Sequence, residues 1–281
     1  MATRFSEVDR TMHDFFLSGY DVINMFKLHV KTPKQMGITV VGIHNIRSNK
    51  IDTYFENSNV IKKSNYLIKL TEKWNSKRSI NTEASIIGLI PGLTLSADVI
   101  MECNKRSKIL KLTSEYHNEY VALNLDTKFK GSKPIINASA VAAYNGLTGG
   151  VKVEYSTSKK ALNLSKFIMS YMIKNAVFTA NVTNMELISG SMFTTYVDRI
   201  NLGLKCCWSI KHHTGSAVVG SQYQVNKALK LRAKFNNKGQ LYIGSSIKIN
   251  KSAKLTLVNL IECFRFNSSP ILIGIGVEFN L

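Results

Sequence analysis

Cations alternate with apolar residues along several stretches of the chain, most sharply in LKLRAKF at residues 229–235. Apolar residues take the odd positions there, and Lys230, Arg232 and Lys234 take the even ones. Because side chains on a strand point alternately to opposite faces, the cations share one face. A low-dielectric wall that carries cations concentrates anions beside it. We predict that the strand cations on this kind of face line a pore and attract anions, and that two cations of the N-terminal segment, Arg4 and Arg10, join them. The strand cations are Lys27, Lys31, Lys69, Lys73, Lys128, Lys152, Lys230, Arg232, Lys234 and Lys248.

The sequence lacks the spacings of common catalytic and metal sites. It has no P-loop, G-x-S-x-G or H-E-x-x-H motif, and His212 and His213 have no carboxylate or cysteine at ligand spacing. The four cysteines form no C-x-x-C pair, which favours a reducing origin without a disulfide framework. We therefore predict no enzyme activity, no catalytic residue, no metal and no cofactor.

The charge balance limits the class of partner. Lys and Arg number 37 against 18 acids, giving a formal charge of +19. Nucleic acid, an anionic membrane surface and anionic solutes are all compatible with this charge. The hydrophobic content of 44% is typical of a folded chain, and no stretch resembles a linker, so one large domain is favoured.

The closing stretch ILIGIGVEFNL, residues 271–281, has apolar residues at every odd position, while its even positions are small or polar except for Leu272. In a soluble protein the apolar side would meet a core, and in an outer-membrane barrel it would meet lipid. The N-terminus has no apolar secretory region, and its acids argue against a cleavable transit peptide. We therefore expect neither a bacterial nor a secreted protein.

Similar alternation recurs in FKLHVK (26–31), YVALNLDTKF (120–129) and LYIGSSIKI (241–249). The most apolar region, residues 84–101, contains Pro91 and Gly92, so we predict two strands joined by a tight turn rather than a membrane helix. With about 13 residues for each strand and its turn, the portion after residue 25 accommodates roughly 19 membrane-spanning strands. The predicted fold is an all-β barrel over residues 26–281.

The N-terminal residues 1–25 differ from the rest. Phe5, Val8, Met12, Phe15 and Phe16 recur at three- and four-residue steps, which predicts one short amphipathic helix. Gly19 follows as a stop signal and a candidate hinge.

Several segments carry a family resemblance over nearly the whole chain. The segments are LTEKWNSKRSINTEASI (70–86), GLTGGVKVEYSTSKKALNLSKF (146–167), VNKALKLRAKFNNKG (225–239) and the closing GVEF (276–279). In order and spacing the chain resembles the mitochondrial porins, the voltage-dependent anion channels. This family is itself the standard example of a barrel with 19 strands, so the resemblance and the strand count are not independent.

The resemblance implies a barrel in the mitochondrial outer membrane with the N-terminal helix inside the pore. It implies passage of ATP, ADP, phosphate and other small anionic metabolites, nucleotides among them, and closure at high voltage of either sign. The implied partners are membrane lipids, further copies of the chain, and a kinase or an apoptosis factor that docks on it. Nucleic acid is not implied as a main partner.

The chain departs from the family pattern at three places. Asp21 and Ile23 occupy positions where the family hinge has glycine, leaving Gly19 alone. The family's Gly-Leu-Lys, linked to nucleotide contact, reads Gly92-Leu93-Thr94, so no lysine is carried over. One helix lysine position holds Arg10, and another holds Ser18, which has no charge.

In YLIKLTEKW, Glu72 alternates with its neighbours in step with the apolar residues Leu70 and Trp74. Its carboxyl group should therefore lie on the apolar face of the strand, which points at lipid. A charge there is costly, and the family has a membrane-facing glutamate at the matching place. We predict that Glu72 influences oligomerisation or partner binding rather than conduction. A register shift that brings it to the headgroups is the alternative.

Two functional questions stay open at this point. Voltage sensing needs a charge that moves through the membrane field, where the energy is about 2.3 kcal/mol per elementary charge per 100 mV. Either a helix with Arg4 and Arg10 or a displaced lysine-bearing strand would provide this moving charge. A helix that only plugs the lumen is the alternative. A protein-conducting barrel of the same superfamily and a soluble basic β protein that binds nucleic acid are the rival functions.

Overall fold

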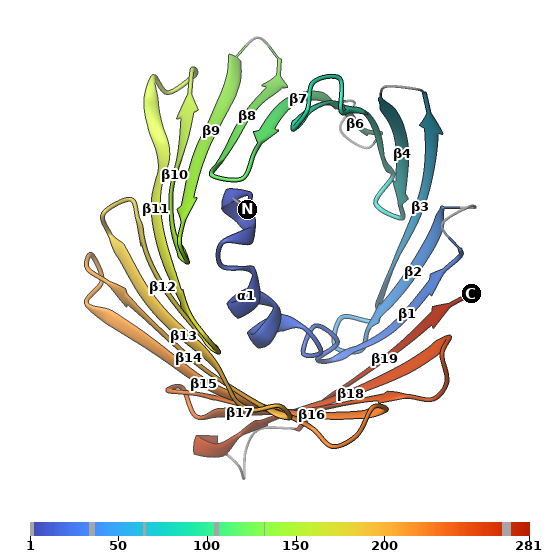
Figure 1. Cartoon of the computed structure of the whole chain (residues 1–281). Coiled ribbons are helices and arrows are strands. Elements are labelled where there is room, and N and C mark those ends of the chain that lie inside the picture. Colours follow the sequence, from blue (N-terminus) through green and yellow to red (C-terminus); the bar gives the residue numbers. More distant parts are fainter. Residues whose placement is uncertain (1–2, 34–36, 64–65, 104–106, 132, 266–270) are drawn as a thin grey trace. The chain divides into compact units, whose positions relative to one another are not determined.

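The computed structural model describes residues 3–33, 37–63, 66–103, 107–131, 133–265 and 271–281. In this part of the chain there are nineteen strands, one α-helix, α1 (Arg10–Leu17), and two short 3-10 helices, η1 (Phe5–Glu7) and η2 (Cys263–Arg265) (Figure 1). The strands are β1 (Met25–Lys31), β2 (Ile38–Asn45), β3 (Lys50–Lys62), β4 (Leu67–Asn75), β5 (Ser79–Ile87), β6 (Leu93–Glu102), β7 (Ser107–His117), β8 (Val121–Lys130), β9 (Lys133–Tyr144), β10 (Leu147–Ser156), β11 (Ala161–Ile173), β12 (Ala176–Thr183), β13 (Leu187–Val197), β14 (Ile200–Ser209), β15 (Thr214–Gln224), β16 (Leu229–Asn236), β17 (Gln240–Lys248), β18 (Ala253–Glu262) and β19 (Leu272–Asn280).

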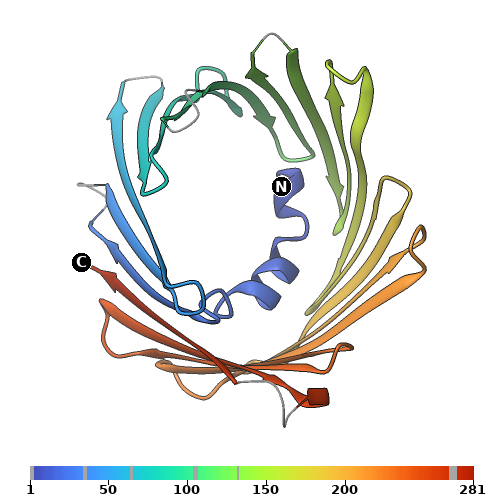
Figure 2. The same cartoon turned by 180° about the vertical axis from the view of Figure 1, so that it is seen from behind.

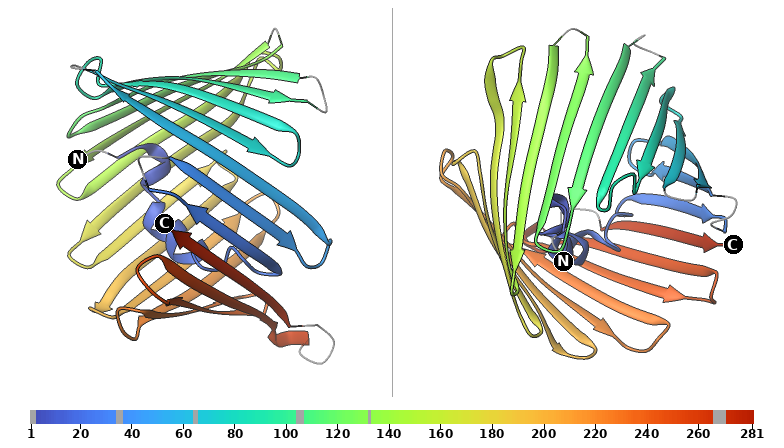
Figure 3. Two further views of the ribbon diagram at one scale, coloured as in Figure 1. Left: turned by 90° about the vertical axis from the view of Figure 1, so that its right-hand side faces the viewer. Right: turned by 45° about the horizontal axis from the view of Figure 1, so that its top comes forward.

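The hydrogen-bonded strand order is cyclic. Strands that follow one another in the sequence are neighbours in the sheet, and β1 also pairs with β19. That pair is parallel, with Phe26 opposite Ile275 and His29 opposite Glu278. Successive hairpins reverse the strand direction, as Figure 3 shows for β7 to β10, so the first and last of an odd number of strands run the same way. The predicted 19-stranded β-barrel is therefore confirmed.

The packing divides the chain into two compact units. Unit 1 comprises Met1–Val8, Thr32–Val40 and Asp52–Met169, and unit 2 comprises Asp9–Lys31, Val41–Ile51 and Ser170–Leu281. Each unit thus has a part of the N-terminal segment and a run of consecutive strands. The expected division at residues 25 and 26 falls where β1 begins, at Met25.

The two faces of the sheet differ as the alternation predicts. In the β18–β19 register Leu255 lies opposite Val277, and Thr256 lies opposite Gly276. The odd residues of β19 therefore share one face with the odd residues of β18, and Ile273 on this face is 54% exposed. An apolar face that stays exposed is expected where lipid rather than protein covers it.

Residues 84–101 form the end of β5, a turn and most of β6, as predicted. Gly92 in this turn has φ +83°, a conformation that glycine adopts without steric cost. Among the described residues, no helix is both long enough and apolar enough to cross a bilayer.

The predicted short N-terminal helix is present as α1, and the 3-10 helix η1 precedes it. The helical segment is split into η1 and α1, and the residues between them, Val8 and Asp9, form a turn. Two contacts explain the break: Val8 packs with Phe5 against one wall in unit 1, and the Asp9 carboxylate lies 4.0 Å from Lys205 Nζ in unit 2. The apolar residues of the segment therefore serve two separate contacts.

Candidate pore wall and docked N-terminal segment

In unit 2, helix α1 packs against one face of the sheet, which we call the inner face. Figure 2 shows α1 from behind in this position. Met12, Phe15 and Phe16 form a buried cluster with Phe193 of β13 and Val218 of β15. The Phe15 ring contacts Phe16 edge-on at 5.0 Å between centroids and Phe193 at 5.4 Å. The predicted apolar helix residues are thus the ones that attach the helix to the sheet.

Two glycines make room for Phe15. Gly203 of β14 and Gly220 of β15 are cross-strand partners. A Cβ atom on Gly203 would overlap Phe15 Cε1 and lie 2.7 Å from Cδ1, and one on Gly220 would lie 2.9 Å from Cε1. Real Cβ atoms do not approach ring carbons so closely, so this glycine pair forms the floor on which the ring sits.

The linker from Gly19 to Asn24 crosses further glycines. Val22 lies over Gly274 and Gly276 of β19, where a Cβ atom on Gly274 would overlap the Val22 carbonyl. Tyr20, Val22 and Val258 form a buried cluster with Ile23 and Tyr242. The small even residues of the closing strand therefore let the linker backbone approach the inner face.

In unit 1, residues 4–8 contact the inner face of the sheet. Phe5 and Val8 pack against Ala122 of β8 and Val141 of β9. Arg4 Nη2 lies 2.6 Å from Glu115 Oε2 of β7. Arg4 is therefore held in an ion pair with the wall.

All ten predicted strand cations lie on the inner face. In unit 2 the register places Lys234 opposite Gly220, which contacts the helix residue Phe15. It likewise places Lys27 opposite Gly276. In unit 1 the strand registers connect the inner residue Val141 to Lys152 and, through β8 to β5, to Lys69. The ten residues are Lys27, Lys31, Lys69, Lys73, Lys128, Lys152, Lys230, Arg232, Lys234 and Lys248.

These cations differ in what they contact. Lys27 Nζ lies 2.6 Å from Asp21, and Lys73 Nζ lies 3.9 Å from Glu56. Neither Lys128 nor Lys152 forms an ion pair or side-chain hydrogen bond with any residue that the structure describes. The same is true of Lys69, Lys230 and Lys248 within the described part of the chain. Uncompensated charge is more available to mobile ions than paired charge, so Lys128 and Lys152 are among the anion-attracting candidates.

Lys234 and Arg232 contact the docked segment instead. Lys234 Nζ donates a hydrogen bond to the Phe16 carbonyl at 2.8 Å. Arg232 packs against Gly19, donates from Nε to Gln222 at 3.2 Å and donates from Nη1 to Ser246 at 3.3 Å. The helix arginine Arg10 is exposed and lies 3.5 Å from Asp14.

Gly19 is conformationally required. Its φ is +82°, and a Cβ atom there would overlap the Arg232 guanidinium. The structure therefore gives Gly19 a steric role at the end of the helix, and its role as a hinge stays a prediction.

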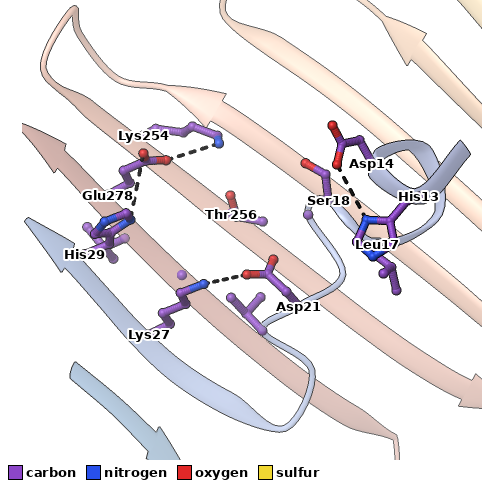
Figure 4. Close-up of a pocket in the computed structure, with 14 residues that line it drawn as sticks. His13, Asp14, Leu17, Ser18, Asp21, Lys27, His29, Lys254, Thr256 and Glu278 are labelled. Carbon is purple, nitrogen blue, oxygen red and sulfur yellow. Dashed lines mark hydrogen bonds and ion pairs between the residues drawn. The ribbon is translucent and has the colours of Figure 1, made fainter. Parts of the chain in front are cut away.

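A cavity of about 370 Å³, with charged side chains in its lining, lies in unit 2 between the end of α1, the linker and the inner faces of β1, β18 and β19. Figure 4 shows Glu278 between Lys254 and His29, with Lys27 facing Asp21. Glu278 carboxylate oxygens lie 3.3 Å from Lys254 Nζ and 3.5 Å from Lys31 Nζ. This carboxylate links β18, β19 and β1 across the parallel pair that closes the sheet.

Glu72 lies on the outer face of β4. It is exposed and shares its parity with Trp74, which is 52% exposed, while Thr71 on the opposite parity is 2% exposed. Its cross-strand neighbours on the same outer face are Asn57 and Thr82, which are also polar.

Sequence reasoning missed three inner-face residues that the structure makes prominent, Lys205, Lys254 and Glu278. The alternation of apolar and polar residues would have found Lys205, because apolar residues flank it at alternate positions in LGLKCCW (202–208). The alternation alone cannot identify the glycines beneath Phe15 or the contact of Lys234 with Phe16, since both depend on the path of the N-terminal segment.

Comparisons with known proteins show the family and the fold. A family described as "Eukaryotic porin" matches residues 2–272. The "Voltage-dependent anion-selective channel" of Drosophila melanogaster is 30% identical over 98% of both chains. The "Non-selective voltage-gated ion channel VDAC2" of Xenopus laevis is 27% identical, again over 98% of both. A solved variant of Rh. blastica porin, 8% identical, aligns with a TM-score of 0.53 over 86% of this chain and 91% of that one. With its transmembrane β-barrel, this chain belongs to the eukaryotic porin family.

Proposed function

We propose that this protein is a voltage-gated, anion-favouring channel of the mitochondrial outer membrane that passes small metabolites such as ATP, ADP and phosphate. The observation that carries the proposal is a cyclic sheet with an exposed apolar outer face and lysines along its inner face. Closed sheets of 16 to 18 strands already leave an aqueous channel, so 19 strands are sufficient. The relatives' names add voltage dependence, but they divide between "anion-selective" and "non-selective".

Anion preference is the part that this chain's own residues support. A unit charge about 12 Å away in water attracts an anion by about 0.35 kcal/mol, a factor of about 1.8 in local concentration. The uncompensated Lys128 and Lys152 together contribute a factor of about 3 at low salt, where screening is weak. Paired cations contribute less, because the adjacent carboxylate cancels part of their field.

Reversal potentials in a potassium chloride gradient test the proposal. The wild-type protein in planar bilayers should show a reversal potential of the sign that chloride permeation gives. Lys128→Gln combined with Lys152→Gln should move that potential toward zero. Lys108→Gln is the matched control, because Lys108 is exposed on the outer face of β7. Cation preference in the wild type, or equal shifts in the double variant and the control, would contradict the proposal.

Location is tested separately. The protein should fractionate with mitochondrial outer membranes and resist extraction by alkaline carbonate, since lipid contacts its apolar outer face. Release into the carbonate supernatant would argue against membrane insertion.

A further inference from the structure

Lys234 has a set of contacts that an ion-attracting lysine would not need. Its ammonium group donates to the Phe16 carbonyl at 2.8 Å, in the last turn of α1. It also lies over the rings of Tyr20 and Tyr242, 4.2 and 4.4 Å from their centroids. The two rings meet edge-on, at 6.1 Å and 80°. The ammonium is thus enclosed by one carbonyl and two aromatic faces.

Each contact has a physical basis for holding the helix. The last carbonyls of a helix have no partner within it and carry the negative end of its dipole, so a cation there is favourable. Aromatic faces attract cations, and more strongly when water is excluded. Tyr20 is 5% exposed. Burial raises the pKa of Tyr20 to about 12, although nearby Arg232 opposes this, so the ring stays neutral at physiological pH.

We propose that Lys234 is the docking residue that holds the end of helix α1 on the inner face of the barrel, and that releasing it changes voltage gating without changing ion selectivity. Arg232 supports the same junction by packing over Gly19 and by its hydrogen bonds to Gln222 and Ser246. The gating part rests on the proposed function, whereas the docking part does not.

Thiol labelling measures docking without any conduction. The reporter is Met12→Cys in a chain whose four natural cysteines are replaced by serine, because Met12 is 1% exposed on the face of α1 that packs against the sheet. A water-soluble maleimide should label this thiol slowly in the refolded protein. Lys234→Met should raise the labelling rate 10- to 100-fold, Lys234→Arg should stay within about threefold of the parent, and Lys108→Met should leave the rate unchanged.

Tyr242 provides a second route if Lys234→Met does not refold. Tyr242→Phe keeps the ring and should label like the parent, whereas Tyr242→Leu removes one face of the enclosure and should label several-fold faster. Labelling of Lys234→Met, or of Tyr242→Leu, at the parental rate would overturn the docking role.

Bilayer recording then separates gating from selectivity. Lys234→Met should shift the voltage of half-closure while its reversal potential stays at the parental value. A shift in reversal potential as large as that of the Lys128 and Lys152 double variant, with unchanged half-closure, would show that Lys234 acts as a pore cation instead. If the parent itself shows no voltage-dependent conductance, the proposed function fails, and the labelling result still decides whether Lys234 docks the helix.

Discussion

Replacing Gly203 with alanine should release helix α1 from the sheet. The new Cβ atom would overlap the Phe15 ring, which is 9% exposed and seated between Phe16 and Phe193. Carbon atoms prefer separations of about 3.5–4.0 Å, so the ring must move by about 1 Å or more. Gly190 of β13 is the control position, because a Cβ atom there would meet nothing within 4 Å.

The size of the effect follows from what the ring loses. Burying a phenylalanine side chain contributes about 1.5–3 kcal/mol. Each edge-on aromatic pair adds about 0.5–1.5 kcal/mol, and extra carbon in a packed site costs about 1–3 kcal/mol. A partial loss of about 2 kcal/mol would raise the undocked population about 30-fold. The strand pairing should be unaffected, since Gly→Ala removes no backbone hydrogen bond.

Maleimide labelling of the Met12→Cys reporter is the assay, because its rate follows the undocked population when the helix reseats faster than the thiol reacts. Circular dichroism of the same samples checks that the barrel has formed. Gly203→Ala should label about 30 times faster than the parent, and Gly190→Ala should label at the parental rate. Equal rates in all three proteins would refute the conclusion that the glycine floor positions the helix.

Three further predictions concern other positions. Glu278→Gln should lower the temperature at which the barrel unfolds in a heat-shift gel by a few degrees, because partly exposed ion pairs contribute about 1 kcal/mol or less; an unchanged temperature would remove Glu278 as a link across the closing strands. Gly19→Ala should speed labelling of the Met12→Cys reporter, since alanine resists a φ of +82° and displaces Arg232; parental labelling would mean that the junction tolerates both changes. Glu72→Gln should reduce chemical cross-linking of the protein in liposomes and leave the reversal potential unchanged, and a change in selectivity alone would contradict its outward placement.

Much of the fold follows from local pattern. The alternation in LKLRAKF and ILIGIGVEFNL predicts strands and assigns each residue to a face, and the observed registers agree with that assignment. The prediction succeeds because a strand repeats every two residues, so each face can be identified from a few neighbours in the chain. The same rule places Glu72 on the outer face and all ten predicted strand cations on the inner one.

Only the tertiary structure decides what each inner-face residue contacts. Lys128 and Lys234 look equivalent in the sequence, yet they differ in their contacts. Lys128 has no carboxylate partner among the described residues, whereas Lys234 is hydrogen-bonded to Phe16, 218 residues away along the chain. The break between η1 and α1 and the glycines beneath Phe15 likewise depend on where the N-terminal segment lies. The sequence by itself determined which face each strand residue occupies, because that depends on local backbone geometry. Contacts between distant segments determined which of those residues touch the docked helix and which have no ion-pair partner among the described residues.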